Sequence, residues 1–251
     1  MKVLLIAGTH GVEPQSSVFL QSLLSLIESK YAKTFSTKEL CSLSLSLLLG
    51  FDLDPCEKAV LSVQNLDFDL TCLHEAKLIA VPLLNPYGKK HFVRHNARGV
   101  DLNRNLPTKN WEAARLKIDG VANPYYPGEF PASELETQLL TRLIELSRCD
   151  LVISFHTNHF IRHPNPPQVN YDSVSGKYKA FAMKLAADTQ LEFTEDIGYP
   201  TPGSLGSYAK DRMIDCITIE FDDNDSPEQL AEKYLVSFAE NISALFSPSH
   251  A

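Results

Sequence analysis

The sequence lacks the features of disulfide-rich, membrane-spanning or nucleic-acid-binding proteins. Its five cysteines are an odd number without a CxxC pair, which argues against a disulfide framework and against a cysteine-based zinc site. No Lys/Arg cluster occurs and the net charge is −8, so nothing indicates a nucleic-acid partner. No apolar run is long enough to span a bilayer, so we expect no membrane partner.

What is present indicates an ordinary globular protein. With 251 residues, 44% of them hydrophobic, the chain is long enough for one well-buried α/β domain, and we expect residues 1–251 to form it. The apolar run of residues 2–7 is too short for a signal peptide, and no cleavage site follows. Together with the scattered cysteines, this predicts a cytoplasmic protein.

Apolar periodicity predicts alternating strands and helices. The predicted strands are 2–7, 77–84, 150–155 and 216–221. The predicted helices are 16–29, 133–148, 177–189 and 227–246. Residues 89–131, 157–176 and 197–208 are predicted loops, and residues 30–75 show no clear period. The alternation indicates a mixed, mostly parallel central sheet with helices on both faces.

Polar side chains follow the predicted strands at the positions where such sheets bind ligands. His10 and Glu13 come after the first strand, Asn85 after the second and His156 after the third, while Glu220 stands at the end of the fourth. Ligands bind beyond the carboxyl ends of strands in open α/β sheets. We therefore expect these side chains to share one site.

The residues His10-Gly11-Val12-Glu13 form an HxxE pair, which can direct an imidazole and a carboxylate at one metal ion. Taken alone, the pair is a weak signal, because a helix-capping glutamate beside an incidental histidine is the commoner origin of such a match. His156 adds the third ligand of a catalytic zinc site with an open position for water. His159 and His163, in the loop that follows, are rival ligands.

Glu220 lies in a β-branched strand, where a carboxylate is costly to bury without a partner or a task. Facing the metal, it could act as general base and then as general acid. A solvent-facing glutamate at a strand end is the alternative.

Residues 94–105, RHNARGVDLNRN, form the densest polar segment of the chain. Arginine offers a planar fork that matches a carboxylate, and asparagine adds neutral donors. The segment indicates an anion receptor, or else a solvated charged loop.

The order of these motifs resembles the M14 zinc carboxypeptidases. It runs from HxxE through N-P-x-G at 85–88 and R-x-N-x-x-G-V-D-L-N-R-N at 94–105 to the strand histidine and glutamate. The likeness extends from Gly8 to Glu220, covers residues 30–75 poorly, and has a highly specific element in D-L-N-R following HxxE.

The resemblance implies a zinc carboxypeptidase-like fold, one Zn²⁺ ion and a small peptide substrate with a free C-terminal carboxylate. It implies that His10, Glu13 and His156 are the zinc ligands and that Glu220 is the general acid/base. The remaining implied roles are the oxyanion stabiliser Arg94, the carboxylate-binding residues Asn103 and Arg104, and the mobile tyrosine Tyr199.

Within the family, residues 199–208, YPTPGSLGSY, and 94–105 resemble members that cleave the γ-D-glutamyl–meso-diaminopimelate bond of murein tripeptide in cell-wall recycling. His95 departs from the small residue usual at its position. Leu205 lies in the segment that shapes the specificity pocket of relatives. Because it is apolar, it does not indicate whether the substrate's C-terminal side chain is basic or acidic.

Two rival functions stay open. Deacylases of the aspartoacylase or succinylglutamate desuccinylase type share HxxE and D-L-N-R, whereas Tyr199 and the Arg94-x-Asn96 segment favour a carboxypeptidase. A non-catalytic peptide-binding relative would lack a ligand or the acid/base, and here His10, Glu13, His156 and Glu220 are all present.

Overall fold

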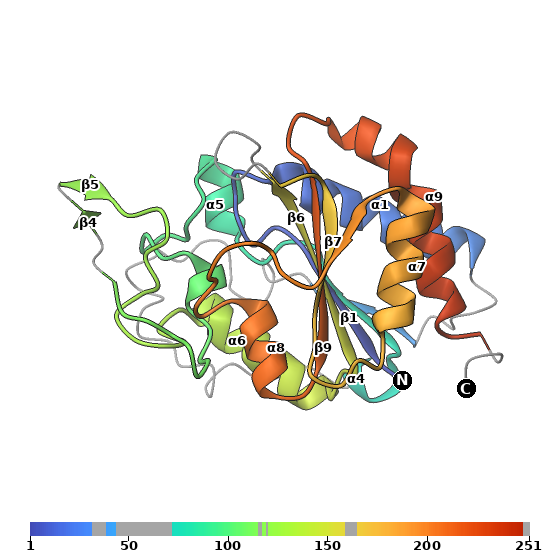
Figure 1. The fold of residues 1–251 in the computed structure, drawn as a ribbon, viewed down its shortest axis with the longest axis horizontal. Helices are drawn as coiled ribbons and strands as arrows, with labels where there is room; N and C mark the ends of the chain where they lie inside the picture. The colour runs from blue at the N-terminus through green and yellow to red at the C-terminus, as the bar shows by residue number, and fades with distance from the viewer. Residues whose placement is uncertain (32–38, 44–71, 115–116, 119, 159–164, 248–251) are drawn as a thin grey trace.

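The structure is a computed structural model that describes residues 1–31, 39–43, 72–114, 117–118, 120–158 and 165–247. Within these residues, a seven-stranded sheet forms the centre of the molecule (Figure 1). From edge to edge its strands are β2 (Leu40–Ser42), β3 (Leu78–Val81), β1 (Val3–Ile6), β6 (Leu151–Asn158), β9 (Asp215–Asp222), β7 (Gln168–Asp172) and β8 (Glu192–Thr194). Separate from it, β4 (Lys117–Ile118) and β5 (Val121–Ala122) form an antiparallel pair.

The sheet is mixed and mostly parallel, as predicted. Strands β2, β3, β1, β6 and β9 run in one direction, whereas β7 is antiparallel to β9 and carries β8 in parallel beside it. Both β7 and β8 were missed from sequence. Pro166 and Pro167 stand immediately before β7 and indicated a loop, yet the residues after them alternate polar and apolar as a strand does.

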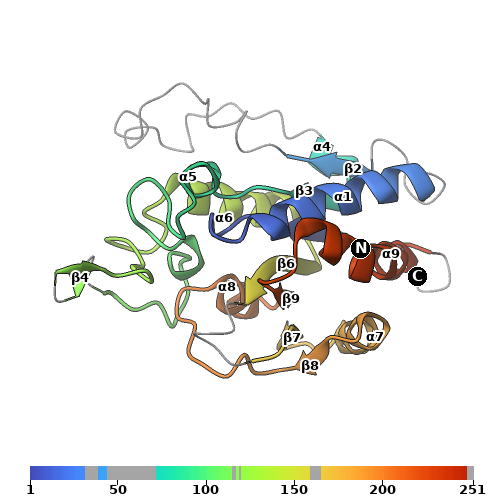
Figure 2. The same ribbon diagram turned by 90° about the horizontal axis from the view of Figure 1, so that it is seen from above.

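Helices cover both faces of this sheet (Figures 1 and 2). One face packs against α1 (Pro14–Lys30), α7 (Lys179–Thr189) and α9 (Pro227–Ala244). The other packs against α4 (Cys72–Glu75), α6 (Leu135–Ser147) and α8 (Leu205–Asp211), and α5 (Pro86–His91) lies near the carboxyl edge. Among the described residues, none of the helices meets the length and hydropathy that a membrane span requires.

Strand β1 explains why the sequence begins with an uninterrupted apolar run. Val3 and Leu5 point into the core under α1, α7 and α9, while Leu4 and Ile6 point into the core on the opposite face. Successive side chains of a strand face opposite sides, so a strand covered on both faces needs apolar residues throughout.

The helix ends test the capping patterns. Ser226 caps α9 in a capping box with Gln229, and Pro227 opens the helix as predicted. The sequence Ser133-Glu134-Leu135-Glu136 predicts a capping box at Ser133, and this prediction is wrong, because Glu134 is the N-cap of α6 and its side chain makes no capping hydrogen bond. The Ser133 hydroxyl instead donates to Glu134 at 2.7 Å.

Helix α8 lies partly inside the predicted loop 197–208. Ser204 caps it by accepting a hydrogen bond from the Ser207 N–H. Gly203 precedes it with a φ of +69°, a conformation that favours glycine. The glycine, proline and serine residues therefore form the entry to a short helix that the loop pattern concealed.

Hydroxyl groups surround the buried carboxylate of Asp215 at the start of β9. Tyr171 donates to Oδ2 at 2.5 Å, and Ser173 and Ser175 donate to Oδ1 at 2.5 and 2.6 Å. The Tyr178 N–H donates to Oδ2 at 2.9 Å. Burial alone would raise the pKa of Asp215, but these hydrogen bonds outweigh it and hold the pKa below its ordinary value. The carboxylate thus joins β9, β7 and the segment leading into α7.

We expect Asp215→Asn to lower the free energy of unfolding by about 2 kcal/mol at neutral pH, because hydroxyl donors lose a charged acceptor. A depressed folded-state pKa stabilises above the unfolded pKa of about 3.9, and this stabilisation is lost as pH falls through the folded pKa. Urea unfolding at pH 7 and about pH 3.5 should therefore show a smaller wild-type advantage at the lower pH. The exposed Glu232→Gln is the control; an advantage of equal size at both pH values would contradict this account.

Candidate active site

Strand pairing brings His10, Glu13 and His156 to the carboxyl edge of the sheet. Strands β1 and β6 are parallel neighbours with Ile6 opposite Ser154. His10 follows the end of β1, and His156 lies two residues beyond Ser154. Glu13 is the N-cap of α1 and comes directly after the turn that carries His10.

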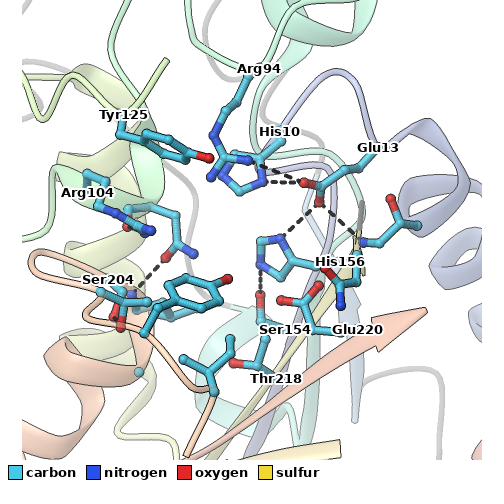
Figure 3. A pocket seen from close by; sticks show the side chains of 18 of the residues that line it. His10, Glu13, Arg94, Arg104, Tyr125, Ser154, His156, Ser204, Thr218 and Glu220 are labelled. Atoms are coloured by element: carbon cyan, nitrogen blue, oxygen red, sulfur yellow. Dashed lines mark hydrogen bonds and ion pairs between the residues drawn. The ribbon is translucent and has the colours of Figure 1, made fainter. Parts of the chain in front are cut away.

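The three side chains converge closely. His10 Nδ1 lies 2.6 Å from Glu13 Oε1, and His156 Nδ1 lies 3.0 Å from Glu13 Oε2 (Figure 3). One ligand atom from each residue lies within 4.8 Å of the other two, and all three residues are buried. Two imidazoles and a carboxylate suit zinc, leaving one tetrahedral position for water or substrate. The group therefore fits a metal ion by donor chemistry and by convergence.

The second nitrogen of each histidine also has a partner. His10 Nε2 lies 3.1 Å from Asp101 Oδ1, and His156 Nε2 lies 3.0 Å from Ser154 Oγ. Such partners fix the ring orientation of ligating histidines and tune the bound metal. Sequence reasoning assigned no role to either partner, although Asp101 belongs to the D-L-N-R motif and Ser154 stands at i−2 from His156 on the same strand face.

Opposite charges compensate one another around this group. Burial alone would raise the pKa of Glu13, but His10 and His156 outweigh it and hold the pKa far below its usual range. Arg94 and His10 do the same for the buried Asp101. Arg94 donates from Nε to Asp101 Oδ2 at 2.9 Å, which fixes its guanidinium beside the metal-binding group.

Glu220 lies on β9 directly opposite His156 on β6. Both residues therefore lie in strand interiors. The predicted strand 150–155 ended before His156, but β6 continues to Asn158. Burial raises the pKa of Glu220 to about 7, with Glu13 adding to the shift and His156 opposing it. A carboxyl group of this pKa can accept and return a proton near neutral pH.

Two arginines and a tyrosine lie across the cavity from Glu220 (Figure 3). The Tyr125 ring lies 5.1 Å from Arg94 Cζ and 5.7 Å from Arg104 Cζ, within cation–π range of both. Arg104 also donates to the Asn103 carbonyl at 2.7 Å. Tyr125 was missed from sequence, because its loop shows no pattern that marks a functional residue.

A cavity of about 830 Å³ joins these groups. The residues to which the sequence assigned a role in the site all line it: His10, Glu13, Arg94, Asn103, Arg104, His156, Tyr199 and Glu220. Asn85, which was also expected to share the site, does not line the cavity; it caps α5 by accepting a hydrogen bond from the Gly88 N–H at 2.8 Å. Gly203 allows the Tyr199 segment to approach, since a Cβ at Gly203 would lie 2.1 Å from the Arg104 carbonyl oxygen. The Asn103 side-chain oxygen accepts from the Leu205 N–H at 2.9 Å, so a ligand would meet the Asn103 amide nitrogen.

Some residues that drew attention in the sequence lie elsewhere. Asn96 is buried and donates to Glu134 Oε2 at 2.7 Å, which ties the 94–105 segment to α6. Its place is structural and not in an anion receptor. The rival ligands His159 and His163 lie outside the described residues.

Comparison with known proteins defines the class. A family model described as zinc carboxypeptidase matches residues 70–240. The chain belongs to this family of zinc-dependent peptidases. The matched range contains His156 and Glu220, and it begins after His10 and Glu13.

The curated relatives that this chain resembles in sequence are murein peptide amidases. Murein peptide amidase A of Escherichia coli strain K12 is 35% identical over 162 residues, which are 62% of this chain and 62% of the relative. Murein peptide amidase A of Vibrio campbellii is 31% identical over 163 residues, which are 62% of this chain and 60% of the relative. The chain thus matches less than two thirds of the length of these relatives.

Solved structures of zinc carboxypeptidase fold resemble this chain as well. The crystal structure of murein-tripeptide amidase MpaA from Escherichia coli O157 has a TM-score of 0.60 at 27% identity, covering 96% of this chain and 81% of that chain. Bovine thrombin-activatable fibrinolysis inhibitor in complex with tick carboxypeptidase inhibitor has a TM-score of 0.60 at 14% identity, covering 98% of this chain and 81% of that chain. The second likeness concerns the fold alone.

We expect Asp101→Asn to weaken zinc binding about 10–100-fold, because the substitution disturbs the partner of His10 Nε2 and places an amide where Arg94 needs a carboxylate. Competition with a chelator measures this affinity. Asp188→Asn, on the outer helix α7, is the matched control and should bind zinc as the wild type does. An unchanged affinity in a folded Asp101→Asn variant would contradict the role of Asp101.

Proposed function

We propose that this protein removes the C-terminal residue of a short peptide, cleaving the γ-D-glutamyl–meso-diaminopimelate bond of murein tripeptide. One observation carries the hydrolytic part of the proposal. The group of His10, Glu13 and His156 shares a cavity with Glu220 on one side and with Arg94 and Arg104 on the other.

In this proposal His10, Glu13 and His156 hold one zinc ion. Zinc, when bound, makes water nucleophilic at neutral pH and polarises the carbonyl that it contacts. Asp101 and Ser154 keep the two imidazole rings turned so that Nδ1 of each faces Glu13. The three ligands thus approach the metal already oriented.

Glu220 is the proposed general acid/base. Its pKa of about 7 suits a group that takes a proton from the attacking water and returns it to the leaving nitrogen. Arg94, whose Nε is fixed by Asp101, turns its remaining guanidinium nitrogens toward the site and stabilises the oxyanion that develops on the scissile carbonyl.

Asn103, Arg104 and Tyr199 are proposed to hold the free carboxylate of the substrate. Arg104 offers a planar fork, Asn103 offers its amide nitrogen, and binding there would fix which peptide bond reaches Glu220. Burial raises the pKa of Tyr199 to about 12, with Glu220 adding to the shift. Its phenol therefore stays protonated at neutral pH and can donate a hydrogen bond.

The murein substrate is proposed from the relatives, whose names describe murein peptide amidases, and from the likeness of residues 94–105 and 199–208 to such members. A place in peptidoglycan recycling in the cytoplasm belongs to the same proposal. Within the described residues, the buried Cys149 and Cys216 are free thiols, which suits a reducing compartment.

Zinc-loaded protein should release diaminopimelate from L-Ala-γ-D-Glu-meso-diaminopimelate, and a chelator should abolish the release. Mass spectrometry measures it beside a panel of ordinary C-terminal dipeptides and N-acetyl amino acids. Cleavage of ordinary peptides alone would overturn the murein substrate. Cleavage of N-acetyl compounds alone would favour a deacylase, and zinc binding without any cleavage would favour a non-catalytic relative.

Glu220→Gln should keep its zinc and lose turnover by roughly 10²–10⁴-fold, because the amide cannot transfer the proton. Metal content by atomic emission and kcat by the same mass-spectrometric assay test the two parts separately. Glu232→Gln, at an exposed position on α9, should leave both unchanged. A Glu220→Gln variant with wild-type turnover would remove Glu220 from the mechanism.

A further inference from the structure

The cavity contains a second charged group, away from the metal-binding residues. Asp172, the last residue of β7, and Lys210, near the end of α8, both line it, and Lys210 Nζ lies 3.7 Å from Asp172 Oδ1. None of the proposed catalytic steps uses either residue. The Lys210 side chain is about half exposed, at 49%, and that of Asp172 is 28% exposed, so both groups are accessible to a ligand.

The pairing of β7 with β9 fixes how far this pair lies from the acid/base. Glu220 pairs with Gln168, and four residues back along β9 Cys216 pairs with Asp172. Four residues of a strand span about 13 Å. Thr218 lies midway and also lines the cavity, so the space is continuous from Glu220 to Asp172.

Asp172 is held in place from two sides. The Asn170 amide, oriented so that its oxygen accepts from the Ile197 N–H at 3.2 Å, donates to Asp172 Oδ2 at 3.0 Å. Gly206 lets the carboxylate rest against the first turn of α8, because a Cβ there would lie 2.5 Å from Asp172 Oδ2. Lys210 stands four residues after Gly206, on the same face of that helix. Strand β7 and helix α8 thus place one anion and one cation side by side.

The opposite charges of Asp172 and Lys210 indicate a ligand that carries both an ammonium and a carboxylate. A lone carboxylate would select a basic side chain, and a lone ammonium would select an acidic one. At 3.7 Å the two groups are farther apart than in an ordinary charged hydrogen bond, and a half-exposed ion pair of this kind is held weakly. A ligand that carries an ammonium next to a carboxylate can replace the contact between Asp172 and Lys210. Its ammonium would pair with Asp172 and its carboxylate with Lys210.

We propose that Asp172 and Lys210 determine specificity by binding the distal amino acid group of the substrate's C-terminal residue. Asp172 binds the ammonium and Lys210 the carboxylate. The inference rests on the proposed function, since it concerns the residue that Asn103 and Arg104 hold by its α-carboxylate. In diaminopimelate three methylenes separate the two amino acid carbons, so the distal carbon lies roughly 5 Å from the α-carbon and its charged groups lie farther still. A side chain of that length extends away from Glu220 and toward Asp172 and Lys210.

Burial supports the assignment. It raises the pKa of Asp172, and Lys210 only partly opposes this, while Asp196 adds to it. A ligand ammonium brought against Asp172 would supply the missing compensation.

Three tripeptides of the form L-Ala-γ-D-Glu-X test the proposal through kcat/KM. X is meso-diaminopimelate, L-lysine, which lacks the distal carboxylate, or L-2-aminopimelate, which lacks the distal ammonium. The wild type should prefer diaminopimelate to either analogue by at least about tenfold, because each analogue leaves one of the two charged groups without its ligand partner.

A substitution at Lys210 or at Asp172 should remove the preference for diaminopimelate over one analogue and keep the preference over the other. Lys210→Met should bring diaminopimelate and lysine within about twofold while retaining the preference over 2-aminopimelate. Asp172→Asn should do the reverse. Lys109→Met removes a lysine that pairs with Asp211 at the end of the same helix, and it should leave all three ratios unchanged. Thermal unfolding of each variant shows whether the fold is retained.

Failure of this inference differs from failure of the proposed function. If the wild-type protein cleaves none of the three tripeptides, or cleaves only the ordinary C-terminal dipeptides of the first assay, the murein substrate is overturned and this assignment with it. Wild-type protein that prefers diaminopimelate while the folded variants keep the same ratios would overturn the role of Asp172 and Lys210 alone. Equal cleavage of the lysine and diaminopimelate peptides by the wild type would also overturn it.

Discussion

The site depends on one constraint, the parallel pairing of β1, β6 and β9. Parallel neighbours end at the same edge of a sheet, so residues far apart in the chain meet without long connections. This pairing places His10 beside His156, and His156 opposite Glu220 in register. A strand shift of one residue would turn either His156 or Glu220 to the other face, so the register that buries the core also aligns the chemistry.

Charge compensation is the second requirement. Glu13 and Asp101 are buried anions, and their desolvation is offset by Arg94 and by the two imidazoles. A buried charge without a partner would be severely destabilising. Arg94 therefore stabilises the folded site through Asp101 as well as facing the cavity, and Tyr125 holds both arginines on that side. The groups around His10, Glu13 and His156 form one network, and removing any one of them affects its neighbours.

The sequence predicted the parts of the fold that local patterns determine. Apolar runs identified β1, β3 and β6, since strands buried on both faces show little polar alternation. Strand β9 was identified by its β-branched and apolar residues, which alternate with Thr218 and Glu220. Strand β7 was not predicted, because prolines precede it and because it pairs with β9, which lies far along the chain. The candidate metal ligands were identifiable because they lie at or just beyond the carboxyl ends of buried apolar runs. Tyr125, Asp172 and Lys210 were not, because their relation to the cavity exists only once segments far apart in the chain are packed together.

The central claim is that His10, Glu13 and His156 bind zinc. Anomalous diffraction at the zinc absorption edge, from crystals of the zinc-loaded protein, tests it most directly. The account predicts one anomalous peak, about 2.0–2.2 Å from Nδ1 of His10, Nδ1 of His156 and a carboxylate oxygen of Glu13. A peak coordinated by His159 or His163 in place of these residues, or no peak in the cavity of fully loaded protein, would contradict it.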